Sequence, residues 1–126
     1  MTENEISSIV LDSALKIHKN LGPGIFESVY EQILFYELTK IKGLHVEKQK
    51  SIVFKWDNQP LDLGFRLDLL VENKVIIELK SVESIHNVHY KQLLTYLKVT
   101  GLKLGLLINF NEALLKDGFK RVVNKL

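Results

Sequence analysis

The chain has 126 residues, of which 46% are hydrophobic and 25% are charged, and its formal net charge is +2. This length and balance are typical of a single globular domain spanning residues 1–126, which can bury a core without disulfides or a structural metal. The sequence contains no cysteine, which excludes a disulfide framework and a zinc site built from thiolates. The small net charge permits contact with nucleic acid but is far from the footprint of a strongly basic protein.

No targeting or membrane segment is visible in the sequence. The first ten residues, MTENEISSIV, are acidic and lack a basic stretch followed by an apolar core. No apolar run approaches the ~20 residues that a membrane-spanning helix needs. We therefore expect a cytoplasmic protein with no membrane partner.

Two helices are predicted at the start of the chain. Thr2 and Glu5 have the spacing of a capping box, and apolar residues recur at helical intervals over residues 3–20. The sequence Gly-Pro-Gly at 22–24 ends this helix. A second wide apolar face then predicts a helix over residues 25–41.

The remainder of the chain is predicted to contain strands and one more helix. The expected elements are a strand over 45–56, strands over 62–71 and 75–80, a helix over 86–99 and a buried strand over 104–110. The tail, residues 111–126, fits either an edge strand or a short helix. Three meandering strands followed by a helix and a further strand predict an α/β fold with a mixed sheet flanked by helices.

Residues 65–80 have the pattern of a β-hairpin with one apolar and one charged face. Strand side chains alternate between faces, and the odd-numbered residues are all apolar outside the turn: Phe65, Leu67, Leu69, Val71, Val75, Ile77 and Leu79. The even-numbered face carries Arg66, Asp68, Leu70, Ile76, Glu78 and Lys80. A three-residue turn at 72–74 sets Val71 opposite Val75. The same count sets Asp68 opposite Glu78 and Arg66 opposite Lys80.

The predicted opposition of Asp68 and Glu78 raises a chemical question. Directly opposed residues have Cβ atoms about 4.5–5.5 Å apart, so two carboxylates there repel. A divalent cation with oxygen ligands would relieve the repulsion, and Mg²⁺ commonly uses one or two carboxylates. Alternatively, the face is solvated and Arg66 and Lys80 balance the acids. Apolar Leu70 and Ile76 on the same face favour a covered site over a solvated one.

Polar residues on two predicted helices add to this group. Glu27 lies near the start of the second helix at the margin of its apolar face, although a glutamate there also favours the helix dipole. Glu31, one turn later, is expected to be solvated. Gln92 and Tyr96 are four residues apart in the third predicted helix, so they share a face. They fit either ligand binding or a partly buried polar pair.

These residues resemble the signature of the PD-(D/E)XK nuclease superfamily. Asp68 followed by Glu78-Leu79-Lys80 resembles its D…(D/E)-x-K motif, although Leu67 replaces the proline, which is not a ligand. The predicted element order resembles the restriction-endonuclease-like αβββαβ core with an extra N-terminal helix. GIFESVY at 24–30 fits G-x-x-E-x-x-Y. Together with GFRLDLLVENKVIIELK, QLLTYLKVTGLKLGLLINF and GFKRVVN, it makes the chain similar to GxxExxY proteins over nearly its full length.

The resemblance implies a nuclease that uses Mg²⁺ or Mn²⁺ to hydrolyse phosphodiester bonds of DNA or RNA. Glu27 would complete an acidic cluster in which Asp68 and Glu78 bind the metal ion, with the Leu79 carbonyl as a further ligand. Lys80 would position or activate the attacking water and stabilise negative charge on the phosphate.

The resemblance also implies a role for Gln92 and Tyr96. They resemble the Q-x-x-x-Y element of the RecB-like branch, where these residues help to bind the metal site or nucleic acid. A second interpretation is a catalytically silent module that keeps the fold and binds nucleic acid or protein. A homodimer or a protein partner is also expected, through an exposed strand edge at residues 104–110 or in the tail.

Overall fold

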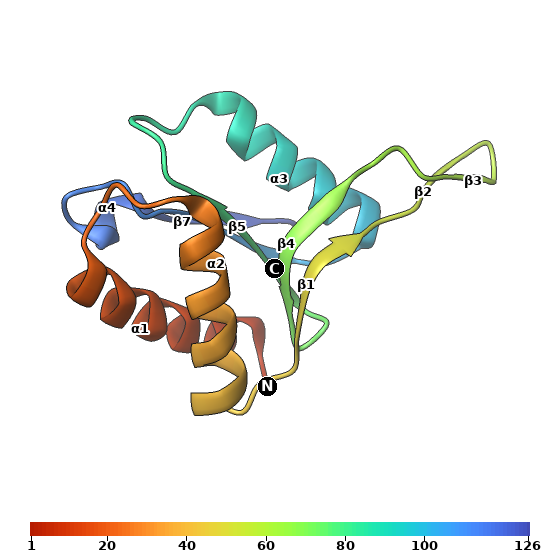
Figure 1. The fold of residues 1–126 in the computed structure, drawn as a ribbon. Coiled ribbons are helices and arrows are strands. Elements are labelled where there is room, and N and C mark those ends of the chain that lie inside the picture. Colours follow the sequence, from red (N-terminus) through yellow and green to blue (C-terminus); the bar gives the residue numbers. More distant parts are fainter.

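The computed structural model describes residues 1–126, which form a mixed sheet between two layers of helices (Figure 1). The five strands of the sheet lie in the order β1-β4-β5-β6-β7; β5 and β6 are parallel and the other neighbours are antiparallel. The elements are α1 (Glu3–Leu21), α2 (Glu27–Tyr36), η1 (Glu37–Ile41), β1 (Val46–Ser51), β2 (Phe54–Trp56), β3 (Gln59–Leu61), β4 (Arg66–Val71), β5 (Val75–Lys80), α3 (Asn87–Thr100), β6 (Leu104–Asn109), α4 (Leu115–Gly118) and β7 (Phe119–Val123). The predicted α/β fold with a mixed sheet is therefore confirmed.

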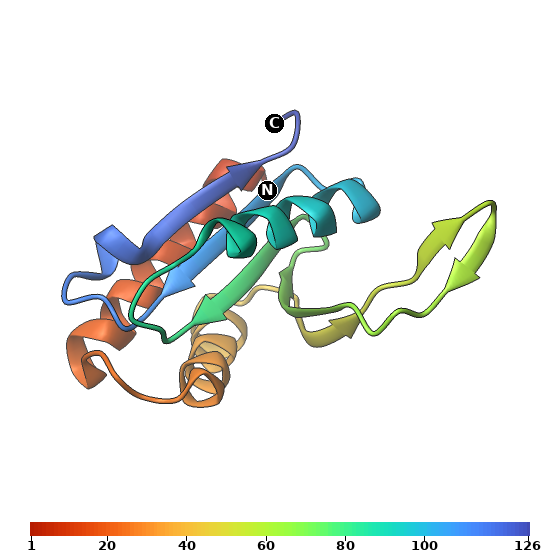
Figure 2. The same cartoon turned by 90° about the horizontal axis from the view of Figure 1, so that it is seen from above.

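Each face of the sheet carries its own hydrophobic cluster. The cluster under α1 and α2 contains 19 buried residues, among them Ile6, Leu34 and Ile77. The cluster under α3 contains seven, among them Leu93 and Leu97. Figure 2 shows α3 lying over the sheet in the view from above. Most apolar burial, and hence most of the hydrophobic stabilisation, lies on the α1–α2 face. None of the helices combines the length and apolar character required to cross a membrane.

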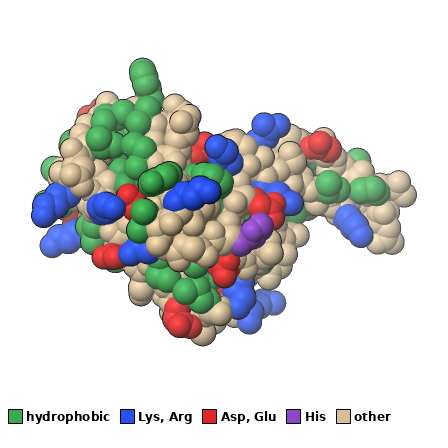
Figure 3. All heavy atoms as spheres, turned by 60° about the horizontal axis from the view of Figure 1, so that its bottom comes forward, with side chains coloured by type: hydrophobic (Ala, Val, Ile, Leu, Met, Phe, Trp, Pro, Cys, Tyr) green, Lys and Arg blue, Asp and Glu red, His purple; other side chains and the backbone are tan.

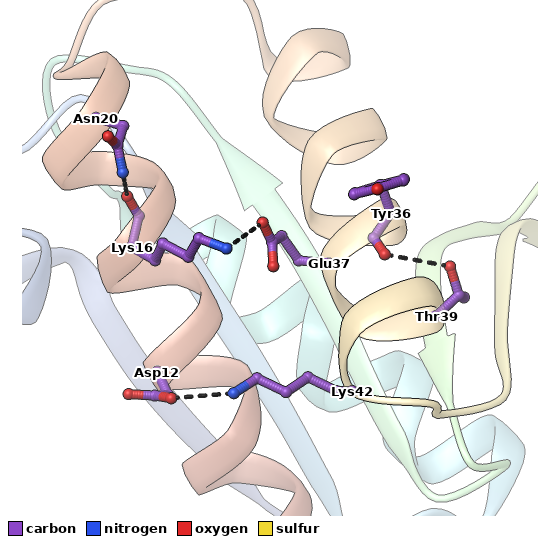
Figure 4. A network of polar contacts seen from close by, with 7 residues as sticks. All are labelled: Asp12, Lys16, Asn20, Tyr36, Glu37, Thr39 and Lys42. Atoms are coloured by element: carbon purple, nitrogen blue, oxygen red, sulfur yellow. Dashed lines mark hydrogen bonds and ion pairs between the residues drawn. The ribbon is translucent and has the colours of Figure 1, made fainter.

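The two N-terminal helices pack against each other and are joined by ion pairs. The predicted capping box is confirmed, because Glu5 N donates to Thr2 Oγ1 and Thr2 N donates to Glu5 Oε1. The second predicted helix changes at Glu37 into the π-helix η1. Figure 4 shows Lys16 of α1 paired with Glu37, at 2.8 Å, and Asp12 paired with Lys42, at 3.2 Å. These contacts attach η1, which continues α2, to α1.

The predicted strands over 45–56 and 62–71 are too long. In the main sheet, β1 ends at Ser51 and β4 begins at Arg66. Much of the intervening chain pairs with itself as the ribbon β2–β3, which projects from the body (Figures 1 and 2). Hydrophobic side chains stay exposed on the ribbon (Figure 3); Trp56 is 64% exposed. Residues that favour strands explain the predicted strands here, but these residues pair locally in the ribbon and are not buried in the core.

The predicted strand edge at residues 104–110 is wrong. β6 lies between β5 and β7, so both of its backbone edges are already paired. The tail supplies the new edge: after the short helix α4, β7 pairs antiparallel with β6. An edge-to-edge contact with another chain would therefore have to use β7 or β1.

Candidate active site

The predicted register of the β4–β5 hairpin is confirmed at its closed end. Backbone pairing joins Val71 to Val75, Leu70 to Ile76 and Leu69 to Ile77. The pairing of the two strands stops there. The ladder therefore does not extend to the predicted opposition of Arg66 and Lys80, and Arg66 is paired only on its other edge, with Ser51 of β1.

Side chains take over the backbone hydrogen bonding where the hairpin opens. Leu79 N donates to Asp68 Oδ2 at 2.9 Å, and Asp68 N donates to Glu78 Oε1 at 3.4 Å. Each carboxylate thus reaches a backbone amide of the opposite strand. Asp68 and Glu78 lie next to each other, as their predicted opposition requires.

The alternation of side chains along β4 fails at the same place. Leu69 and Val71 belong to the cluster under α1 and α2, but Leu67 belongs to the cluster under α3. Phe65 also packs there, with its ring centroid 5.8 Å from that of Tyr96. The prediction that all odd-numbered apolar residues of the hairpin share one face is therefore wrong for Phe65 and Leu67.

The neighbouring strand β1 explains the change of face. Lys48 of β1 pairs with Leu69, and Lys50 pairs with Leu67. Gln49, which lies between these two residues of β1, has φ +51°. A non-glycine residue with positive φ in a strand is a local distortion that increases twist and redirects side chains. The distortion lies beside Asp68 and turns this part of the sheet into an irregular edge.

The Glu78 carboxyl is almost fully buried, with 6% of its surface exposed. The pKa of Glu78 is raised to about 9, and burial is the main cause. The charge of Asp68 and hydrogen bonding to its side chain add to the shift, whereas the charge of Lys80 opposes it. Desolvation and a like charge both favour the neutral acid. At neutral pH and without a cation, Glu78 therefore holds a proton next to the Asp68 carboxylate.

A hollow of about 160 Å³ lies beside this carboxyl pair. Its lining residues come from three strands and one helix: Glu27, Ser28, Glu31, Gln49, Asp68 and Leu79. Glu27, the first residue of α2, is exposed at the hollow. The structure thus brings Glu27, Asp68 and Leu79 of the predicted site together around one space.

Glu31 also belongs to this hollow, contrary to the expectation that it is solvated. Gln49 Nε2 donates to Glu31 Oε1 at 2.6 Å and lies 3.5 Å from Asp68 Oδ1. Burial raises the pKa of Glu31, and the negative charges of Asp68 and Glu27 add to the shift, whereas the bond from Gln49 opposes it. Gln49 therefore bridges two carboxylates that would otherwise repel.

The G-x-x-E-x-x-Y motif has a structural explanation. Tyr30 Oη donates to Gly22 O at 2.6 Å, and its ring stacks on Phe110 at 4.3 Å. Ser81, directly after β5, donates from Oγ to Ile25 O at 2.6 Å. The loop before α2 is therefore attached both to the core and to the end of β5, and this attachment brings Glu27 to the hollow.

The other predicted site residues differ in position. Lys80 is partly exposed at the end of β5, without an ion pair, and its charge acts on Glu78. Tyr96 is buried on the side of α3 that faces the sheet. Burial, with the charges of Glu78 and Asp68, raises its pKa. Gln92 is exposed and its side chain makes no hydrogen bond, so the structure does not join it to the carboxyl pair.

The chemistry of the donor atoms fits a hard divalent cation. In a strand, the N–H and C=O of one residue point to the same neighbouring strand, so the Leu79 carbonyl faces the same opening as its N–H, which bonds to Asp68. Two carboxyl groups and a carbonyl are the ligands that Mg²⁺ prefers, with water completing the shell. In the structure, no three or more His, Asp or Glu side chains converge closely enough to hold a metal ion by themselves.

Sequence reasoning missed several residues that shape the site. Gln49 follows no motif, and its positive φ arises only from the pairing of β1 with β4. The spacing of Glu31 from Glu27, one helical turn, was the available signal for its position. Asn109 is fully buried and bonds to both Val82 N, at 3.1 Å, and Val82 O, at 2.9 Å, so it holds the chain directly after the site.

The fold and the carboxyl pair define an α/β protein with an acidic site at the opening of its sheet. A family model described as the PD-(D/E)XK nuclease superfamily matches residues 4–122, and the chain belongs to this superfamily. Membership indicates a nuclease-type function, and nucleases of this superfamily generally use divalent metal ions. Comparisons with curated proteins and with solved structures found no match.

Proposed function

We propose that the protein is a Mg²⁺- or Mn²⁺-dependent nuclease that hydrolyses phosphodiester bonds of DNA or RNA. The contact between Asp68 and the buried Glu78 at the opening of the hairpin carries this proposal, because burial and, after it, the charge of Asp68 raise the pKa of Glu78 to about 9. Strongly perturbed acids beside a hollow are typical of functional sites. A cation would relieve the repulsion that keeps Glu78 protonated.

The residues that would hold the metal ion are Asp68, Glu78 and the Leu79 carbonyl, with Glu27 at the margin of the hollow. When bound, the ion would make a nucleophile from water at neutral pH and neutralise charge on the phosphate. Glu78 must lose its proton before it can serve as a ligand, so affinity for the ion is expected to rise with pH.

The protein's own groups have separate roles in this proposal. The Lys80 ammonium stands next in the strand to the metal ligands, where it would orient the attacking water and stabilise charge that develops on the phosphate. The Tyr96 hydroxyl would hydrogen-bond to the carboxyl pair. Gln92, exposed on the same helix, would contact the nucleic acid.

We also propose the narrower GxxExxY assignment, which rests on the spacing of Gly24, Glu27 and Tyr30. Gly24 has φ +87°, a conformation that favours glycine, in the loop that Tyr30 holds. As parts of the same proposal, the 126 residues form one domain and act in the cytoplasm.

The projecting ribbon favours a second candidate function, a nuclease-fold module that binds without cleaving. Val53, Trp56 and Leu63 are each more than half exposed on the ribbon or beside it. Exposed apolar groups of this kind are typical of surfaces that contact another protein or nucleic acid. In this alternative the carboxyl pair would not contribute to catalysis.

A cleavage assay separates the two functions. Purified protein is incubated with labelled single-stranded, duplex and branched DNA and RNA, with Mg²⁺ or Mn²⁺. We expect cleavage that requires the metal and is lost in the Asp68→Ala, Glu78→Ala and Lys80→Ala variants, with their far-UV circular dichroism unchanged. Failure to cleave every substrate with both metals would reject the nuclease and favour the binding module.

A further inference from the structure

One part of the chain is basic and free of acidic residues. Residues 84–111 and 118–126, which contain α3, β6 and β7, have no Asp or Glu, although the chain has 15. They hold six of its 17 Lys and Arg residues: Lys91, Lys98, Lys103, Lys120, Arg121 and Lys125. Arg121 donates to Asn4 of α1 at 2.6 Å, but none of the five lysines forms an ion pair. Although the net charge of the chain is small, its acidic residues are therefore distributed unevenly, and this part of the chain is purely basic.

Three of these lysines surround a hollow of about 430 Å³. The hollow, which we call the lysine hollow, has no hydrophobic lining residue and is formed by Lys98, Gly101, Lys103, Asn124 and Lys125. The lysines come from the last turn of α3, the turn before β6 and the tail after β7. Their convergence therefore depends on the tertiary fold and not on a local run of charge.

Backbone contacts hold the walls of the lysine hollow in place. Asn124 N donates to Lys103 O at 2.8 Å, and Asn124 Nδ2 donates to Leu102 O at 3.1 Å. Gly101 ends α3 with φ +74°, and its N–H donates to Leu97 O at 2.8 Å. These bonds join the tail to the connection between α3 and β6, so the three lysines are carried by ordered backbone.

The chemistry of the lysine hollow favours an anion with several acceptor oxygens. Lys98 alone needs no ligand, because a cation near a helix C-terminus interacts favourably with the dipole. The dipole does not account for Lys103 and Lys125, which come from other segments. Like charges that share one hollow repel, and a phosphate group would relieve the repulsion through charge-assisted hydrogen bonds.

The acidic hollow of the candidate active site does not by itself supply this attraction. It is lined by Glu27, Glu31 and Asp68, which repel phosphates. A bound cation and Lys80 would act on the one phosphate that is cleaved, so the other phosphates of a nucleic acid need positive charge elsewhere, since phosphate contacts dominate its affinity. α3 begins shortly after Lys80 and spans roughly 20 Å at ~1.5 Å per residue before it reaches the lysine hollow. An extended polyanion can reach both places.

We propose that the lysine hollow binds the phosphodiester backbone of the nucleic acid and holds it for cleavage at the acidic site. This proposal rests on the proposed function, because it assigns a second binding site, away from the acidic site, to the same nucleic-acid substrate. It predicts that affinity and catalysis are carried by separate surfaces.

Binding is measured by fluorescence anisotropy with labelled single-stranded and duplex oligonucleotides, in EDTA so that no cleavage occurs, over a series of KCl concentrations. The test variant is Lys98→Ala/Lys103→Ala/Lys125→Ala. Its matched control removes three exposed lysines elsewhere, as Lys19→Ala/Lys40→Ala/Lys116→Ala, and has the same net charge. We expect the test variant to bind roughly tenfold or more weakly and to lose about two to three units of salt slope, with the control within about twofold of the parent.

Three other outcomes would overturn the lysine hollow as a nucleic-acid site. Equal losses in both triple variants would show that only net charge matters, and no loss in the test variant would show that the nucleic acid binds elsewhere. If the parent binds no oligonucleotide, but NMR shows inorganic phosphate shifting the Lys103 and Lys125 amides, the site takes free phosphate. Binding that depends on the lysine hollow, without metal-dependent cleavage, would reject the proposed nuclease and keep this inference.

Discussion

The two ends of the β4–β5 hairpin are held together in different ways. At the closed end, backbone bonds pair Leu69 with Ile77, and the apolar side chains alternate between the two clusters. At the open end, the Asp68 and Glu78 carboxyls bond to backbone amides in place of the ladder. The first arrangement gives stability, whereas the second places two acids in mutual contact at an opening.

This difference shows how a stable scaffold tolerates an unfavourable site. Buried apolar pairs at the closed end stabilise the hairpin independently of the carboxyls. The open end combines a buried acid with raised pKa and a residue of positive φ in the adjacent strand. Both features are typical of sites where function and not stability determines the residue.

The largest expected effect is on activity, from changes at the open end. Replacement of Asp68 or Lys80 by alanine is expected to lower the rate of metal-dependent cleavage by at least about 100-fold, because charge on the phosphate is no longer stabilised. Initial rates on a labelled oligonucleotide measure the effect. Asp117→Ala, an exposed acid in α4, is the control and should keep parental activity.

The next effect is on stability, from a change at the closed end. Ile77 is fully buried, so Ile77→Ala is expected to lower the free energy of unfolding by about 2–5 kcal/mol. Glu78→Gln, a variant of the adjacent residue with nearly the same shape as the protonated acid, should change it by less than about 1 kcal/mol below pH 4.5, where the parent side chain is protonated in both the folded and the unfolded protein. Urea unfolding of both variants and the parent below pH 4.5 tests the contrast. A larger loss for Glu78→Gln would mean that the open end also carries the stability.

The raised pKa of Glu78 predicts a pH dependence of stability. Its pKa is about 9 in the folded protein and 4.5 ordinarily, so between these values unfolding releases a proton. The stabilisation from Glu78 is therefore complete below pH 4.5 and is lost as pH rises toward 9, with a slope of up to about 1.4 kcal/mol per pH unit. Urea unfolding in EDTA should show this decline in the parent but not in Glu78→Gln. Parallel profiles would contradict the shift.

The smallest effect tests the distortion in β1. Gln49→Ala and Gln49→Gly both remove the bond to Glu31, but only glycine accepts φ +51° without strain. The glycine variant is therefore expected to be more stable than the alanine variant by about 1 kcal/mol. Thermal unfolding of the pair measures the difference. Equal stability would mean that this backbone conformation is not strained.

The closed end could be predicted from the sequence, whereas much of the open end could not. Alternating apolar residues and a three-residue turn were sufficient to predict β5 and the register at Val71, because these depend on local pattern. The change of face at Leu67 depends on Gln49 in β1, which is distant in sequence. Periodicity within one strand contains no information about such a neighbour.

The site shows the same division between local and distant signals. Asp68, Glu78 and Lys80 belong to one hairpin, so their relation was visible in the sequence. Glu31 reaches the site only through its contact with Gln49, which packing decides. The lysine hollow combines α3, the turn before β6 and the tail, and no motif joins these segments.

Calorimetric titration with Mn²⁺ tests the central claim most directly, which is that Asp68 and Glu78 share a divalent cation. The parent protein is expected to bind Mn²⁺ with an affinity that rises with pH, and Glu78→Gln to bind at least about tenfold more weakly, because its amide cannot ionise. Equal affinity in the parent and in Glu78→Gln at every pH would contradict the account.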